Sequence, residues 1–300
     1  VLTAEREAPS LGGGAGGDQG QQPDPQQAGP QQAPQPLAPG VKNIVAVASG
    51  KGGVGKSTTA INLALGLAAA GLRVGVLDAD IYGPSQPRMM GVSGRPDSPD
   101  GEKLEPMVGH GIKVMSMGFL VADDTPMIWR GPMVMSALQQ MLKDVNWGEL
   151  DIMIVDMPPG TGDAQLTMAQ QVPLAGAVIV STPQDIALLD ARKGLNMFRK
   201  VDVPVLGIIE NMSYFKCPSC GHESHIFGHG GAREEAERLG VEFLGEIPLH
   251  IDIRTTSDGG QPIVASQPSS DHAEAFRGIS DRIWSKLSTA GRAMPEIVIE

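Results

Sequence analysis

A glycine-rich stretch whose residue types suit the binding of phosphate groups runs from Gly50 to Ser57. Its sequence, Gly-Lys-Gly-Gly-Val-Gly-Lys-Ser, fits the pattern G-x-x-x-x-G-K-[ST]. Glycines let backbone N–H groups close around phosphate oxygens, and the N-terminus of a following helix favours negative charge. We therefore expect Lys56 to reach the β- and γ-phosphates of ATP and the Ser57 hydroxyl to bind Mg²⁺. The predicted ATP-binding residues of this stretch are Ser49, Gly50, Lys51, Gly52, Gly53, Val54, Gly55, Lys56, Ser57 and Thr58.

Three aspartates follow apolar runs that could end beside this loop. Asp78 and Asp80 close the stretch Leu-Asp-Ala-Asp, and Asp156 ends the run Ile152–Asp156. Carboxylates at the carboxyl ends of strands can bind Mg²⁺, directly or through water, and can orient an attacking water molecule. Asp156 fits the aspartate that holds Mg²⁺ in P-loop proteins. By itself the Asp78/Asp80 pair is also compatible with helix caps or turn residues.

The two cysteines of the chain, Cys217 and Cys220, form a single CxxC motif. One such motif in a chain without other cysteines indicates metal or redox chemistry in a reducing cytosol. Within one subunit, His222 and His225 could complete a Cys₂His₂ zinc site. In a symmetric dimer, four cysteines could meet at the two-fold axis and bind a [4Fe–4S] cluster. A dithiol/disulfide couple is the third alternative, and we favour the bridging cluster. His229 is expected to be an exposed loop histidine.

The elements that must position these residues follow from the hydrophobic pattern. Short, almost continuously apolar runs alternate with helical patterns, which is typical of a mostly parallel sheet with helices on both faces, an α/β fold. Ligands bind such sheets at the carboxyl ends of the strands, where the motifs above fall. The expected strands are Ile44–Ser49, Val74–Asp78, Lys113–Met117, Ile152–Asp156, Ala177–Ser181, Val205–Glu210 and Glu242–Gly245. The expected helices are Thr58–Ala70, Pro132–Lys143, Asp163–Gln170, Ile186–Lys200, Gly231–Leu239 and His272–Leu287.

Composition divides the chain of 300 residues into a polar N-terminal segment and one domain. Residues 1–40 are rich in Gly, Gln and Pro and are expected to be a disordered linker. Residues 41–290 then form the ATPase domain, and residues 291–300 form a tail. The net charge of -11 argues against binding to nucleic acid. The sequence holds no apolar run of about 18 residues, the length that a membrane span needs.

With these motifs placed, the chain resembles the Mrp (ApbC-type) iron–sulfur cluster carriers, which are P-loop ATPases of the deviant Walker A type. The resemblance rests on the loop with its extra Lys51, on Asp78 and Asp80, on Asp156–Asp163, and on Cys-Pro-Ser-Cys. Ile81–Ser85 and Glu210–Ser213 also look like that family. The family implies a cytoplasmic homodimer that hydrolyses ATP, receives a [4Fe–4S] cluster from an assembly scaffold and donates it to apo-proteins.

The resemblance also implies roles for single residues. Lys51 would reach the nucleotide of the partner subunit, Asp80 would activate water, and Asp78 would support the metal shell. Asn211 would lie at the adenine, and Pro248 in the loop Ile247–Leu249 would wall the base. The family often carries a small N-terminal domain. Because Val1–Glu5 resembles the last residues of that domain, we expect a truncated chain.

Three other classes of protein compete with the cluster carrier. A positioning ATPase of the same fold would need a basic amphipathic C-terminal helix, and the C-terminal residues are too short and mixed for that. A nitrogenase-type reductase has cluster cysteines far apart in sequence, whereas Cys217 and Cys220 are close neighbours. A zinc-stabilised nucleotide-binding regulator without transfer activity is the remaining alternative, and metal analysis distinguishes it.

Overall fold

The computed structural model describes residues 37–120 and 131–290. Within them a nine-stranded sheet has the order β3-β4-β2-β5-β1-β6-β7-β8, and β9 also pairs with β7. β3 and β8 are antiparallel to their neighbours, and the other pairs are parallel. The strands are β1 (Ile44–Ala48), β2 (Val74–Asp78), β3 (Met107–Gly109), β4 (Ile112–Ser116), β5 (Ile152–Asp156), β6 (Gly176–Ser181), β7 (Val205–Lys216), β8 (Glu223–Ser224) and β9 (Phe243–Leu249).

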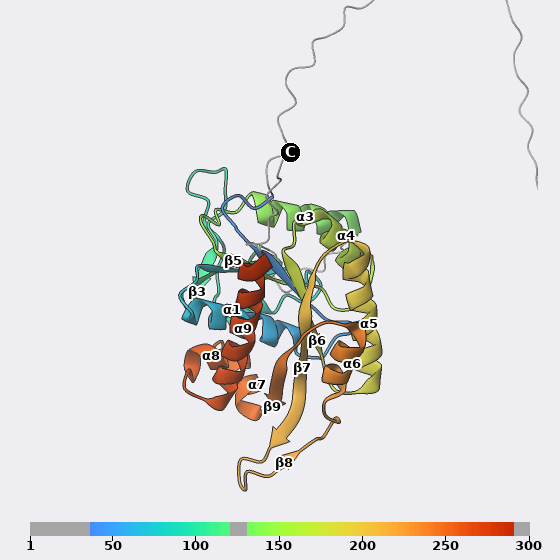
Figure 1. Ribbon diagram of the computed structural model, residues 1–300. Helices are drawn as coiled ribbons and strands as arrows, with labels where there is room; N and C mark the ends of the chain where they lie inside the picture. The colour runs from blue at the N-terminus through green and yellow to red at the C-terminus, as the bar shows by residue number, and fades with distance from the viewer. Residues whose placement is uncertain (1–36, 121–130, 291–300) are drawn as a thin grey trace, which may run out of the picture. The chain divides into compact units, whose positions relative to one another are not determined.

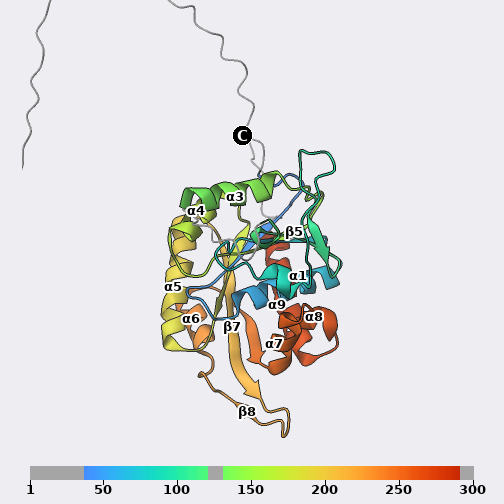
Figure 2. The same ribbon diagram turned by 180° about the vertical axis from the view of Figure 1, so that it is seen from behind.

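Helices cover both faces of this sheet, as the apolar strands require. α1 packs on α8 and α9, whereas α3, α4, α5 and α6 contact one another in succession. Figures 1 and 2 show β7 between α9 on one side and α5 with α6 on the other. The helices are α1 (Lys56–Ala69), α2 (Gln86–Met89), the 3₁₀ turn η1 (Met117–Phe119), α3 (Gly131–Lys143), α4 (Asp163–Gln171), α5 (Asp185–Lys200), α6 (Gly231–Leu239), α7 (Ile251–Asp258), α8 (Ile263–Ser266) and α9 (Asp271–Ala290).

The central strands are buried along their whole length, which explains why their sequences are apolar without alternation. Every residue of β1, β2, β5 and β6 is buried. Parallel strands covered on both faces have no solvent-facing side. The α/β fold with a mostly parallel sheet is thereby confirmed, and every strand and helix expected from the pattern is present.

Some elements differ from the expectation. β7 continues six residues beyond Glu210 to Lys216, because this segment goes on pairing with β9 and its last two residues also pair with the short strand β8. β9 likewise runs on to Leu249. The short elements β3, β8, α2, α8 and η1 were not predicted, since none has more than four residues and so none shows a period. α7, which has eight residues, was also not predicted.

The domain begins before residue 41, because residues 37–40 pack on the core. Ala38 is buried, and the N–H of Leu150 donates to the carbonyl oxygen of Gly40 at 2.9 Å. The rest of the expected linker, residues 1–36, and the expected tail, residues 291–300, lie outside the described residues. Among the helices that the structure describes, none is both long and apolar enough to cross a bilayer.

Candidate functional site

The glycine-rich loop connects β1 to α1 at the carboxyl end of the sheet, so the residues from Ser49 to Thr58 lie together as expected. Gly55 has φ +78°, a left-handed conformation that favours glycine. A Cβ at Gly55 would also come within 2.2 Å of the Asn211 side-chain nitrogen. That Asn211 amide donates to the carbonyl oxygen of Val54 at 2.8 Å. The loop is therefore held from β7 by Asn211, and Gly55 is the residue that permits the contact.

The beginning of the loop rests on α5. A Cβ at Gly50 would lie 2.1 Å from the carbonyl carbon of Asp190, so only glycine fits this close approach of two backbones. The Ser49 hydroxyl donates to the carbonyl oxygen of Lys51 at 2.9 Å and shapes the turn. Lys51 itself is half-buried, and Gly52 and Gly53 are exposed. The loop thus has a fixed base and an open rim.

The residues predicted to bind Mg²⁺ and phosphate meet where β2 and β5 end. Asp78 and Asp156 are register partners in these neighbouring strands. The Lys56 ammonium donates to Asp156 Oδ1 and lies 3.2 Å from the Ser57 hydroxyl oxygen. Lys56 and Asp156 are both buried. The sheet order, in which β5 lies between β1 and β2, brings these side chains together from distant parts of the sequence.

Asp78 organises the loop that follows β2. Its Oδ2 accepts hydrogen bonds from the N–H groups of Ser85 and Gln86, each at 3.1 Å, and from the Ser116 hydroxyl at 3.0 Å. Its Oδ1 accepts from the N–H of Asp80 at 3.2 Å. Burial, followed by the nearby charge of Asp156, raises the pKa of the Asp78 carboxyl to about 7.

Asp80 lies on this loop at the edge of the same site and is half-buried. Burial raises the pKa of its carboxyl above the usual range, the Lys56 ammonium opposes the shift, and the Asp156 carboxylate adds to it. Asp80 therefore lies within electrostatic reach of both buried partners. A carboxylate whose pKa is raised is a better base towards water than an ordinary surface aspartate.

Gln86 is a site residue that the motifs did not indicate. It is fully buried in α2, and its side-chain nitrogen donates to Asp156 Oδ2 at 2.8 Å and to the Ser57 carbonyl oxygen at 3.2 Å. A glutamine after the stretch Ile81–Ser85 carries no spacing signal of its own. Only the packing of α2 against the loop reveals it.

The CxxC motif lies in the turn between β7 and β8, a hairpin that Figure 1 shows extending away from the helical layers. The N–H of Cys217 donates to the His222 carbonyl oxygen at 2.9 Å, and the N–H of Gly221 donates to the Cys217 carbonyl oxygen at 2.8 Å. Both thiols are free, with Cys217 half-buried and Cys220 exposed. The backbone N–H groups of Cys220 and Ser219 point at the Cys217 sulfur and lower the pKa of its thiol. A lowered pKa favours the thiolate, which is the form that binds metals.

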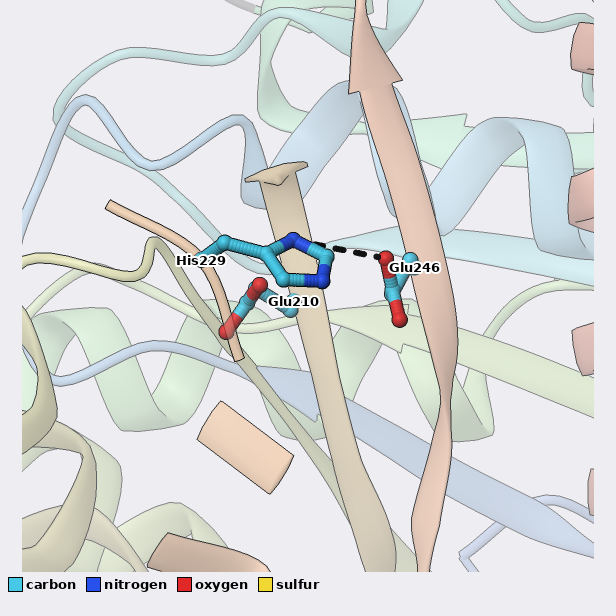
Figure 3. Close-up of side chains that lie close together, drawn as sticks. All are labelled: Glu210, His229 and Glu246. Carbon is cyan, nitrogen blue, oxygen red and sulfur yellow. Dashed lines mark ion pairs between the residues drawn. The ribbon is translucent and has the colours of Figure 1, made fainter. Parts of the chain in front are cut away.

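The histidines of the zinc alternative do not join the cysteines in one ligand group within the described part of the chain. His225 lies 3.9 Å from a Glu223 carboxylate oxygen and stacks on His229, with ring centroids 4.3 Å apart. The group of possible metal ligands that does form consists of Glu210, His229 and Glu246, which Figure 3 shows converging from β7, a loop and β9.

Internal hydrogen bonds already occupy this second group. Glu210 accepts from the N–H groups of Gly230 at 3.0 Å and Ala232 at 2.7 Å, at the beginning of α6. The Ser213 hydroxyl lies 2.6 Å from Glu210 Oε1 and 3.1 Å from Glu246 Oε2. Arg233 pairs with the other oxygen of Glu246 at 2.9 Å. The network fastens the middle of β7 to α6 and β9, and thereby supports the hairpin that carries the cysteines.

Comparisons with known proteins identify relatives that are similar to this chain in sequence and in structure. A family model described as the NUBPL iron-transfer P-loop NTPase, of the ParA group, matches residues 40–284. The iron–sulfur cluster carrier protein of Salmonella typhimurium is 56% identical over 262 residues, which are 87% of this chain and 71% of the relative. The iron–sulfur cluster transfer protein NUBPL of Mus musculus is 56% identical over 253 residues, 84% of this chain and 79% of the relative.

A solved structure agrees with the fold. It is a nucleotide-binding protein from Archaeoglobus fulgidus, described as in complex with ADP and with Co found by PIXE. It superimposes with a TM-score of 0.69 at 42% identity, and the alignment covers 79% of this chain and 92% of that one.

Proposed function

Because this chain belongs to the NUBPL iron-transfer family of P-loop NTPases, we propose that it is an ATP-hydrolysing carrier of iron–sulfur clusters. In this proposal it works as a homodimer, receives a cluster from an assembly scaffold and donates it to apo-proteins. Two free thiols suit a reducing compartment such as the cytoplasm. The proposal joins two sites, the phosphate loop and the CxxC hairpin.

The observation that carries the proposal is the accessible pair of thiols at the end of the β7–β8 hairpin. Cys220 is exposed, and backbone N–H groups favour the thiolate of Cys217. One chain offers two thiolates, whereas a [4Fe–4S] cluster takes four. Two chains related by a two-fold axis supply that number. A cluster held between two exposed hairpins would be open to an acceptor protein, which is what transfer requires.

The proposed binding of Mg-ATP depends on the buried charged residues beneath the glycine-rich loop. The oxygen donors Ser57, Asp78 and Asp156 suit Mg²⁺, which prefers oxygen ligands, and a buried oxygen of Gln86 lacks a partner beside them. We assign Ser57 and Asp156 to the metal and Asp78 to the shell behind them. When bound, Mg²⁺ would neutralise charge on the phosphates. Lys56 would leave Asp156 for the β- and γ-phosphates, and Asp80 would accept a hydrogen bond from the attacking water.

Two further proposed roles concern contacts with the nucleotide of the partner subunit and with the adenine base. Lys51 lies at the open rim of the loop, from which its ammonium could reach the nucleotide of the partner subunit. Asn211 contacts the loop from β7, and Pro248 belongs to the neighbouring strand β9. We propose that these two residues border the adenine, with the Asn211 amide fixed by its bond to Val54.

Cluster transfer to an acceptor tests the proposal. The reconstituted protein should convert an apo-ferredoxin to its holo form under anaerobic conditions, as read by circular dichroism in the visible range. A chelator that captures free iron should not suppress the conversion, because the cluster passes directly between proteins. Transfer that stops completely when the chelator is added would show that the protein merely releases iron, and the proposal would fail.

A further inference from the structure

Gln86 touches each of the three residues that we assign to the magnesium site. Its backbone N–H donates to Asp78 Oδ2 at 3.1 Å. Its side-chain nitrogen donates to Asp156 Oδ2 at 2.8 Å and to the Ser57 carbonyl oxygen at 3.2 Å. The residue is 0% exposed. One side chain therefore links the loop after β1 to the carboxylate at the end of β5, while its backbone is tied to β2.

The orientation of the Gln86 amide is fixed by chemistry. Both side-chain partners, a carboxylate and a carbonyl, only accept hydrogen bonds, so the NH₂ end of the amide must face them. The oxygen Oε1 then points elsewhere, and it is buried without a hydrogen-bond partner. A buried acceptor without a donor is costly.

Asp156 is held at both of its oxygens, by different partners. Lys56 donates to Oδ1 and Gln86 donates to Oδ2. If Lys56 moves to the phosphates of ATP, Oδ1 becomes free and Oδ2 stays tied to Gln86. The carboxylate would then keep its direction, with one oxygen left to hold the metal. Without Gln86, nothing among the contacts described for Asp156 would hold its side chain during that exchange.

We propose that Gln86 is a positioning residue for Mg²⁺, because its NH₂ group fixes the direction of the Asp156 carboxylate that would hold the metal. The inference rests on the proposed nucleotide function and adds a residue to it. The short helix α2 begins at Gln86, with Pro87 in its first turn, so the amide is presented by a restrained backbone. Loss of a partner that orients a metal ligand typically lowers metal affinity by about 10- to 100-fold.

Equilibrium binding of a fluorescent ATP analogue, with Mg²⁺ and in EDTA, tests this inference without measuring hydrolysis. Gln86→Leu keeps a similar volume and removes the amide. It should bind the analogue in EDTA like the unmodified protein, but the Mg²⁺ concentration needed to tighten binding should rise about ten-fold or more. Asn62→Leu is the matched control, because Asn62 is a buried amide in α1 that accepts from the N–H of Val264 and donates to the carbonyl oxygen of Thr58, without contacting Asp78 or Asp156. It should lower thermal stability and leave the Mg²⁺ requirement unchanged.

The outcomes separate this inference from the proposed function. If the unmodified protein does not bind the analogue at all, the nucleotide function is wrong. If it binds with a clear Mg²⁺ effect, and Gln86→Leu shows the same Mg²⁺ requirement, the positioning role is wrong. Should Gln86→Leu fail to fold, Gln86→Glu takes its place, since it keeps length and polarity but sets a carboxylate against Asp156. An unchanged Mg²⁺ requirement in Gln86→Glu would overturn the inference equally.

Discussion

The Lys56 ammonium and the Asp156 carboxylate form an ion pair inside the protein, with side chains 6% and 0% exposed. The motifs assign Lys56 to the phosphates of Mg-ATP and Asp156 to the metal. Binding would therefore exchange one buried ion pair for two new contacts. An ion pair of this kind is costly to break by removing only one partner, because the other charge is left without compensation.

Replacing the lysine should affect binding and folding together. We expect Lys56→Ala to lower ATP affinity by at least ten-fold in equilibrium titration, because the charge facing the phosphates is lost. The free energy of unfolding should fall by no more than about 3–5 kcal/mol, since Gln86 still donates to Asp156. Lys193→Ala is the control, since that lysine forms an exposed pair with Asp190. Unchanged ATP affinity in Lys56→Ala would remove the phosphate assignment.

Asp80→Asn should separate binding from hydrolysis. The change keeps the shape of the side chain but weakens its ability to accept a proton or orient water. We expect ATP affinity to stay within about two-fold while turnover falls by about 100-fold or more, within the usual range for a general base. Single-turnover hydrolysis and equilibrium titration provide the two readings. Parallel losses in both would instead identify Asp80 as a metal or folding residue.

The raised pKa of Asp78 predicts a pH dependence of stability in EDTA. The folded carboxyl has a pKa of about 7, against about 3.9 in an unfolded chain, so the folded state binds the proton more tightly. Its contribution is complete below about pH 4 and is lost as the pH rises through about 7, by at most roughly 4 kcal/mol. Denaturant melts should show Asp78→Asn losing most stability relative to the unmodified protein near pH 4, and less near pH 8. A gap that widens with rising pH has the opposite sign and would refute the shift.

How much of this could be foreseen from the sequence depends on whether a feature is local. The loop around Gly55 and the strand that ends at Asp156 carry their own spacing, and the structure brings them together as expected. Gln86 and Ser116 belong to no motif with a recognisable spacing, because their roles arise only when α2 and β4 pack beside β2. The same holds for the bond of Asn211 to Val54, which joins positions 157 residues apart.

The β7–β8 hairpin is a second region whose structure could be predicted from the sequence only in part. The apolar half of β7 was predicted, but its continuation to Lys216 was not, because that segment mixes polar residues with Met, Tyr and Phe and shows no continuous apolar run. His229 was expected to be an exposed loop residue and is exposed, but the sequence did not indicate that its ring would lie 3.8 Å from a carboxylate oxygen of Glu246. Such contacts depend on the register between β7 and β9, which pairs Glu210 with Glu246.

Lys51→Ala tests the dimer. If this lysine reaches the nucleotide of the partner subunit, its loss should reduce ATP-dependent dimerisation and turnover, with ATP affinity of the single subunit nearly intact. Sedimentation velocity with a slowly hydrolysed ATP analogue gives the dimer fraction. Lys42→Ala is a suitable control, because Lys42 is exposed and pairs with Asp151 instead. An equal dimer fraction and full turnover in Lys51→Ala would exclude the role across the interface.

The most direct test of the cluster-carrier account is the metal content of the protein after anaerobic reconstitution with iron and sulfide. We expect about four irons and four sulfides per dimer, since each chain supplies two thiolates. Cys217→Ala and Cys220→Ala should each abolish this content, because one substitution removes two of the four ligands, while ATP affinity stays unchanged. His222→Ala and His225→Ala should have little effect. A colourless protein that retains one zinc per chain, and loses it on either histidine substitution, would contradict the account.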